Sequence, residues 1–144
     1  MGVDLFPVLL VDDSKDDVRF FQRAWRQKGI SNPLYVVPHG QACLHFLRHE
    51  AGYASTSEAP RPGVVLMDIR MPVMNGLECL KAIRADPELE LLPVIIFTTS
   101  LEYEDRVLSY KLGCNGFIEK PLDFDHLSTA VAMIHQYWTL CKLP

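Results

Sequence analysis

Five short apolar runs, each followed by an amphipathic stretch, constrain the fold of this chain more than any other feature. The runs occupy residues 8–11, 34–37, 64–67, 94–97 and 117–118. Three of them are continuous and rich in Val, Ile and Leu, which is typical of strands buried on both faces of a parallel sheet. The second and fifth runs are less apolar, and this favours positions at or near an edge of the sheet.

After each run, apolar residues recur every three or four positions, a spacing that predicts an amphipathic helix. Gly29 and Gly113 predict the ends of the first and fourth helices, and Asp86-Pro87 predicts the end of the third. The five predicted apolar stripes are Val18, Phe21, Ala24 and Trp25; Cys43, Leu44 and Leu47; Leu77, Leu80 and Ile83; Tyr103, Val107 and Leu108; and Leu127, Val131, Ile134 and Trp138.

Strands that alternate with helices at this pitch predict a doubly wound α/β domain with right-handed crossovers. At 144 residues the chain has the length of one domain. In such sheets the reactive site lies beyond the carboxyl ends of the strands, so functional residues are expected where the strands end. At these positions the chain carries Asp12, Asp13, Asp68, Thr98 and Lys120.

Three carboxylates are predicted to converge at that edge of the sheet. Asp12 and Asp13 follow the first strand and Asp68 follows the third, and these two strands are neighbours in a doubly wound sheet. Three negative charges in one pocket repel one another unless cations compensate them. Mg²⁺ suits this role because it prefers carboxylate, water and phosphate oxygens, and the Lys120 ammonium is placed to add a second positive charge. With the Thr98 hydroxyl as a donor, the set suits transfer of a phosphoryl group to a carboxylate.

Four segments, in this order and at these intervals, resemble the response-regulator receiver family. They are Val-Asp-Asp at 11–13, Met-Asp-Ile-Arg-Met-Pro-Val-Met-Asn-Gly at 67–76, Phe-Thr-Thr-Ser at 97–100 and Gly-Phe-Ile-Glu-Lys-Pro at 116–121. The resemblance covers residues from about 8 to 138. It implies a (βα)5 flavodoxin-like fold with strand order 2-1-3-4-5, and one receiver domain over residues 1–144 with no output domain.

The resemblance also implies a role for each matching carboxylate. Asp68 resembles the phosphoacceptor of the family, which takes its phosphoryl group in a Mg²⁺-dependent reaction. Asp12 and Asp13 resemble the acidic pair that holds Mg²⁺ with Asp68, and the backbone carbonyl of Arg70 would be a further ligand. Such a domain is a signalling phosphoacceptor, and the only reactions that it would catalyse are its own phosphorylation and dephosphorylation.

Other matching positions imply a switch. Thr98 and Lys120 resemble the hydroxyl and ammonium that stabilise the phosphoryl group. Thr98 would move toward that group, and Phe117 would follow as the switch aromatic. The Lys120–Pro121 bond is often cis in receivers. Partners implied are a sensor histidine kinase, of the phytochrome type by a looser resemblance, or a phosphotransfer protein.

Two other kinds of protein fit this sequence less well. A degenerate receiver that only docks proteins would typically have lost an acidic residue or the Lys, and all are present here. A haloacid-dehalogenase-like phosphatase would carry a second Asp two positions after its nucleophile, where this chain has Arg70. Taken alone, Asp12 or Asp13 could simply cap a helix. The whole ordered set favours the phosphoacceptor.

Composition and the last helix bear on partners. A net charge of −4 argues against a nucleic-acid surface, and no apolar stretch is long enough to span a bilayer, so we expect a cytoplasmic protein. The segment at 50–63 predicts a surface loop. Beside its core stripe, the last helix carries a second apolar strip. This strip predicts a partner surface, here a homodimer. Its residues are Ala130, Met133, Tyr137 and Leu140.

Overall fold

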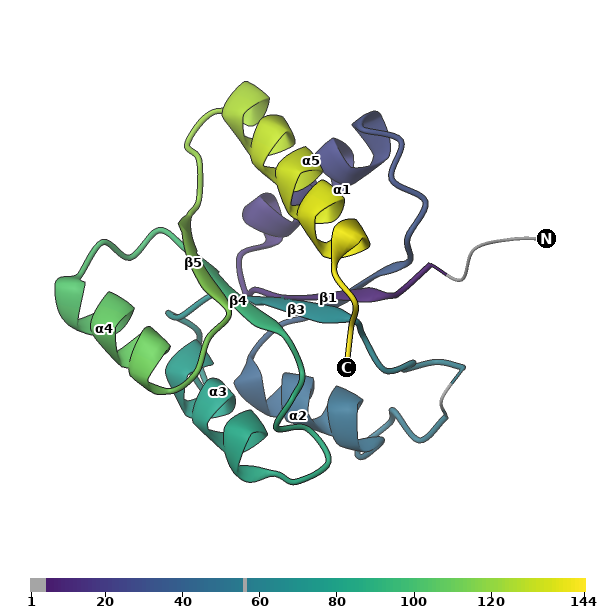
Figure 1. The fold of residues 1–144 in the computed structure, drawn as a ribbon, viewed down its shortest axis with the longest axis vertical. Coiled ribbons are helices and arrows are strands. Elements are labelled where there is room, and N and C mark those ends of the chain that lie inside the picture. The colour runs from purple at the N-terminus through teal and green to yellow at the C-terminus, as the bar shows by residue number, and fades with distance from the viewer. Residues whose placement is uncertain (1–4, 56) are drawn as a thin grey trace.

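The computed structural model describes residues 5–55 and 57–144, which form a sheet with helices on both faces (Figure 1). Five parallel strands lie in the order β2-β1-β3-β4-β5, as the family resemblance implied. α1 and α5 cover one face and α2 and α3 the other, while α4 packs beside β5 and α3. In chain order the elements are β1 (Val8–Val11), α1 (Lys15–Gln27), β2 (Leu34–Val37), α2 (Gly40–Arg48), β3 (Val64–Met67), α3 (Gly76–Ala85), β4 (Val94–Thr98), α4 (Tyr103–Lys111), β5 (Gly116–Glu119) and α5 (Phe124–Leu140).

The sheet separates two hydrophobic cores because successive side chains of a strand point to opposite faces. On β1, Leu9 and Val11 join the core under α2 and α3, whereas Val8 and Leu10 join the core under α1 and α5. β1, β3 and β4 are buried along their whole length, and β2 and β5 are partly exposed. The predicted edge positions of β2 and β5 are therefore confirmed.

Local sequence signals fix the ends of the helices next to the strand ends. Ser14 caps α1 by accepting a hydrogen bond from the Asp17 N–H, and Gly29 follows that helix with φ +67°, in the left-handed region that glycine tolerates. At α3, Asn75 and Glu78 form a capping box, each side chain accepting from the other residue's backbone N–H. These caps set where α1 and α3 begin, directly beside the carboxyl edge of the sheet.

The apolar stripe predicted for α4 is wrong. Tyr103 is 66% exposed and Leu108 is 43% exposed, whereas Asp105 and Ser109 are buried. The helix turns a polar side inward because those two residues find hydrogen-bond partners there: Asp105 pairs with side chains near the sheet edge, and the Ser109 hydroxyl donates to the Asp105 carbonyl. The predicted stripe instead lies largely at the surface.

Three further expectations concern the chain's surface and backbone. In the loop at 50–63, most described residues are exposed, although Ala59 and Pro62 are buried. The Lys120–Pro121 bond is trans, as are the other peptide bonds of the described residues, so the cis form typical of receivers is not found. Within residues 5–55 and 57–144, no helix has the length and apolar character needed to cross a membrane. The cytoplasmic location stays a prediction.

Candidate functional site

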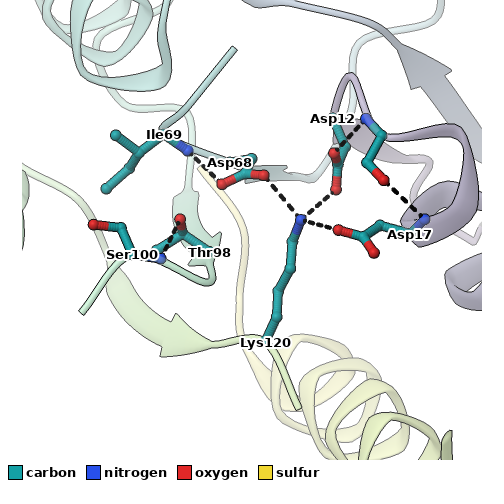
Figure 2. A network of polar contacts seen from close by, with 8 residues as sticks. Asp12, Asp17, Asp68, Ile69, Thr98, Ser100 and Lys120 are labelled. Atoms are coloured by element: carbon teal, nitrogen blue, oxygen red, sulfur yellow. Dashed lines mark hydrogen bonds and ion pairs between the residues drawn. The ribbon is translucent and has the colours of Figure 1, made fainter. Parts of the chain in front are cut away.

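Residues from four strand ends meet in one pocket at the carboxyl edge of the sheet (Figure 2). Asp12 and Asp13 follow β1, Asp68 follows β3, Thr98 is the last residue of β4, and Lys120 follows β5. The register explains the meeting, since Val11 pairs with Met67 across β1 and β3, so the residues that follow them lie side by side. The site predicted from the sequence is thus assembled from the expected elements.

Lys120 connects the carboxylates of the pocket, and its side chain is almost completely buried. Its Nζ donates to Asp12 Oδ2 at 2.6 Å, to Asp68 Oδ2 at 2.9 Å and to Asp17 Oδ2 at 2.9 Å. Figure 2 shows the ammonium between Asp68 on one side and Asp12 and Asp17 on the other. An ammonium group has three N–H donors, so each donor has one carboxylate as its acceptor.

Backbone N–H groups hold the other carboxylate oxygens of the two buried aspartates. Asp12 Oδ1 accepts from the Ser14 N–H at 3.0 Å, and Asp68 Oδ1 accepts from the Ile69 N–H at 2.7 Å. Both side chains therefore have fixed orientations. Asp68 is buried, with 10% of its side chain accessible.

The pocket carries more negative charge than Lys120 neutralises. Ligand oxygens of Asp12, Asp13 and Asp68 lie within 4.8 Å of one another. Burial raises the pKa of Asp12 above its ordinary value, the hydrogen bond and charge of Lys120 oppose this rise, and the nearby Asp68 charge adds to it. Burial alone would lower the pKa of Lys120, but the carboxylates of Asp12 and Asp68 outweigh burial and raise it. Three hard oxygen ligands in a pocket short of positive charge fit a divalent cation.

A second cluster of hydrogen-bonded polar side chains lies on the Thr98 side of the pocket, away from Asp12. Thr98 is fully buried, and its Oγ1 accepts from the Ser100 N–H at 3.1 Å. The Ser100 hydroxyl donates to Asp105 Oδ2 at 2.8 Å, and the same oxygen pairs with the Arg70 guanidinium. Arg70 also donates to Glu102 at 3.0 Å. Side chains after β3 are thereby tied to the loop after β4 and to the start of α4.

Gly76 permits the tight turn that carries Asp68. A Cβ atom on Gly76 would lie 2.0 Å from the Asp68 carbonyl oxygen, and the Gly76 N–H donates to the Ile69 carbonyl at 2.9 Å. The first residue of α3 therefore packs directly on the backbone of Asp68. Phe117 lies on β5, half-buried against the core under α2 and α3. Its switch role stays a prediction, as does the Arg70 carbonyl as a metal ligand.

Sequence reasoning missed two carboxylates, Asp17 and Asp105. Asp17 follows Asp13 by four residues, so a helix that begins at the strand end brings it back over the pocket after one turn. That spacing was a usable signal. Asp105 gave no comparable signal, because its charged partner Arg70 comes from a distant segment, the turn after β3.

The family follows from comparison with known proteins. Residues 8–132 match the model of the response regulator receiver domain, so the chain belongs to the response-regulator receiver family and is a phosphoacceptor signalling protein. It is 33% identical over 131 residues to the response regulator Rcp1 of Synechocystis sp., an alignment that covers 91% of this chain and 87% of that relative.

Solved structures agree with this assignment. The phosphorylated cyanobacterial phytochrome response regulator RcpA is 32% identical, with a TM-score of 0.90 over 98% of this chain and 99% of that one. The Mn²⁺-bound form of Rcp1 is also 32% identical, with a TM-score of 0.85 over 96% of this chain and 99% of that one. The acidic triad of this chain is likewise able to bind a divalent ion.

Proposed function

We propose that Asp68 accepts a phosphoryl group from a histidine kinase in a Mg²⁺-dependent reaction, and that the phosphorylated chain signals through protein contacts. One observation carries the proposal: the buried Asp68 carboxylate lies 2.9 Å from the Lys120 ammonium and within 4.8 Å of Asp12 and Asp13. A nucleophilic carboxylate beside positive charge and hard oxygen ligands is the arrangement that phosphoryl transfer needs.

The residues of the pocket would divide the chemistry between them. A carboxylate oxygen of Asp68 attacks the phosphorus of a phosphohistidine, the N–P bond breaks, and the departing imidazole takes up a proton. Lys120 neutralises charge on the phosphoryl oxygens. Thr98 at present accepts from the Ser100 N–H, which leaves its own hydroxyl hydrogen to donate to a phosphoryl oxygen.

Asp12, Asp13 and Asp68 would hold the Mg²⁺ ion, with the Arg70 carbonyl as a further ligand. When bound, such an ion supplies positive charge that offsets the carboxylates and the phosphoryl oxygens. The closeness of the three carboxylates, whose ligand oxygens lie within 4.8 Å of one another, supports the need for that charge. Mg²⁺ is proposed over larger cations because it favours a few carboxylates together with phosphate oxygens.

A kinase of the phytochrome type is the proposed phosphodonor, with a phosphotransfer protein as the other candidate. Support comes from RcpA, a phytochrome response regulator that aligns with 98% of this chain. The alternative, a degenerate receiver that only docks proteins, is disfavoured because the acceptor, the acidic pair and Lys120 lie together in one pocket.

Intact-mass measurement after incubation with acetyl phosphate and Mg²⁺ tests the phosphoacceptor role. We expect a gain of one phosphoryl mass that is absent from Asp68→Asn and absent when a chelator replaces Mg²⁺. Asp13→Asn should lower the yield by weakening cation binding. A folded chain that gains no mass would favour the docking interpretation, and an equal gain in Asp68→Asn would place the phosphoryl group on a residue other than Asp68.

We also propose that α5 forms a homodimer through its exposed apolar strip. Met133, Tyr137 and Leu140 are 63%, 61% and 82% exposed. A hollow of about 260 Å³ beside them is lined by residues of α5, β5 and β4 and by Asn115. A two-fold interface sets a surface against its own copy, so like charges in it would repel. Residues 126–140 contain no Asp, Glu, Lys or Arg, although the chain has a net charge of −4. This uncharged face of α5 is therefore suited to pack against the same face of a second copy of the chain.

Light scattering across a concentration series, with and without phosphorylation, tests the dimer. Tyr137→Arg should lower the dimer fraction by placing like charges in contact. Thr139→Arg is the matched control, because two residues along a helix lie about 200° apart and so Thr139 faces the other flank of α5. A mass of one chain at every concentration, or equal effects of the two variants, would contradict the proposal.

A further inference from the structure

Asp17 is a fourth carboxylate at the pocket and lies outside the cluster of three that fits a cation. Its Oδ2 accepts from Lys120 Nζ at 2.9 Å, beside the bonds from Lys120 to Asp12 and Asp68 (Figure 2). α1 positions it, because the cap of that helix binds the Asp17 N–H and fixes its first turn. Asp17 is also the most exposed of the three acceptors, with 42% of its side chain accessible.

Lys120 and a divalent cation would compete for the carboxylates of Asp12 and Asp68. In the resting pocket, Asp12 and Asp68 each give one oxygen to Lys120 and the other to a backbone N–H. A cation bound by these aspartates must therefore share their charge with the ammonium. Their attraction for Lys120 then weakens, whereas the attraction of Asp17 for Lys120 does not.

We propose that Asp17 is a positioning residue that retains the Lys120 ammonium on the α1 side of the pocket while Asp12 and Asp68 take up a divalent cation. A side chain changes a binding equilibrium only if it interacts differently with the free and bound states. The Asp17–Lys120 pair is stronger in the bound state, because Lys120 then has weaker competing acceptors. Asp17 thus favours cation binding without being a ligand. The inference rests on the proposed function, since it concerns the cation affinity of the same pocket.

Calorimetric titration with Mg²⁺ of the chain and of Asp17→Asn tests the inference. Asn keeps the shape of the side chain and removes its charge. We expect the Kd for Mg²⁺ to rise about five-fold, which corresponds to about 1 kcal/mol for a partly exposed charge pair. Asp17→Glu, which keeps the charge, should restore the affinity to within about two-fold of the unmodified chain.

Asp16→Asn is the matched control, because it removes the same charge from the same turn of α1. Asp16 is exposed and is not an acceptor of Lys120. We expect it to raise the Kd less than about two-fold, since charges in water are screened. Equal weakening by Asp16→Asn and Asp17→Asn would overturn the inference, because general loss of negative charge would then explain both.

A second comparison tests whether Asp17 acts through Lys120. In a Lys120→Met background, Asp17→Asn should raise the Kd no more than Asp16→Asn does, and an undiminished five-fold effect there would overturn the inference. Phosphorylation with acetyl phosphate separates this result from the proposed function. If Asp68 is phosphorylated but Asp17→Asn leaves the Kd unchanged, the phosphoacceptor role stands and the inference about Asp17 fails.

Discussion

Replacement of Gly76 by Ala should destabilise the whole domain, although Ala is ordinarily the better helix former. The added Cβ would lie 2.0 Å from the carbonyl oxygen of Asp68, 2.9 Å from its carbonyl carbon and 3.1 Å from the Cα of Ile69. All three neighbours are backbone atoms, so no side chain can rotate to make room. The backbone at Asp68 and the start of α3 must move apart instead.

The size of the effect follows from two losses. Overpacking that forces a backbone shift costs about 1–3 kcal/mol. The shift also strains or breaks the 2.9 Å hydrogen bond from the Gly76 N–H to the Ile69 carbonyl, which is worth about 1 kcal/mol. The free energy of unfolding should therefore fall by about 2–4 kcal/mol, a large part of the 5–15 kcal/mol typical of a domain.

Urea unfolding followed by far-UV circular dichroism measures this change. Gly116→Ala is the control, because a Cβ there would meet only Ile95 Cγ2, at an ordinary 3.8 Å, and should change stability by less than about 0.5 kcal/mol. The Ile69 amide resonance should also shift in Gly76→Ala, since its N–H binds the Asp68 side chain. Equal unfolding midpoints for Gly76→Ala and the unmodified chain would refute the reasoning.

Three further predictions concern a titrating pair, the hydrogen bonds of Arg84 and the cation. The hydrogen bond and charge of Asp123 raise the pKa of His126. The stabilisation of α5 by this contact is therefore complete below the ordinary His pKa of about 6.5, and it is lost as the pH rises through the higher pKa of the folded state. NMR titration should show a lower His126 pKa in Asp123→Asn. Arg84 donates to three backbone carbonyls and to the Asn115 side chain, so Arg84→Ala should cost about 2–3 kcal/mol in urea unfolding, and an unchanged midpoint would contradict this. Mg²⁺ at about a hundred-fold its Kd should add about 2.7 kcal/mol to the free energy of unfolding, an increment that a chelator removes and that Asp13→Asn at the same Mg²⁺ concentration largely abolishes.

Sequence reasoning was most successful where one local pattern determines the structure. The predicted bounds of β1, β2 and β3 are those of the structure. β4 and β5 run further than their apolar runs, because hydrogen bonding continues to the pairing of Thr98 with Glu119 regardless of polarity. An apolar pattern detects burial, whereas a strand ends where its ladder of hydrogen bonds ends.

The residues that the sequence did not reveal each pair with a side chain distant in the chain: Asp105 with Arg70, and Asp17 with Lys120. Asp105 is buried because Arg70 and Ser100 donate hydrogen bonds to its carboxylate. No pattern in the sequence of α4 indicates the contact with Arg70. The apolar residues of α4 were consequently assigned to the wrong side of the helix. Lys120 was predicted as a counter-charge, but its third carboxylate, Asp17, depends on how α1 leaves the strand end.

The two cores divided by the sheet have a consequence for how such a domain can be altered. Phe21 on α1 and Cys79 on α3 belong to separate clusters on opposite faces of the sheet. Effects of substitutions without shared neighbours are close to additive. Substitutions that adapt the helices on one face of the sheet to a new partner should therefore leave the packing on the other face unchanged. The sheet acts as a partition that lets the two faces of the molecule be redesigned independently.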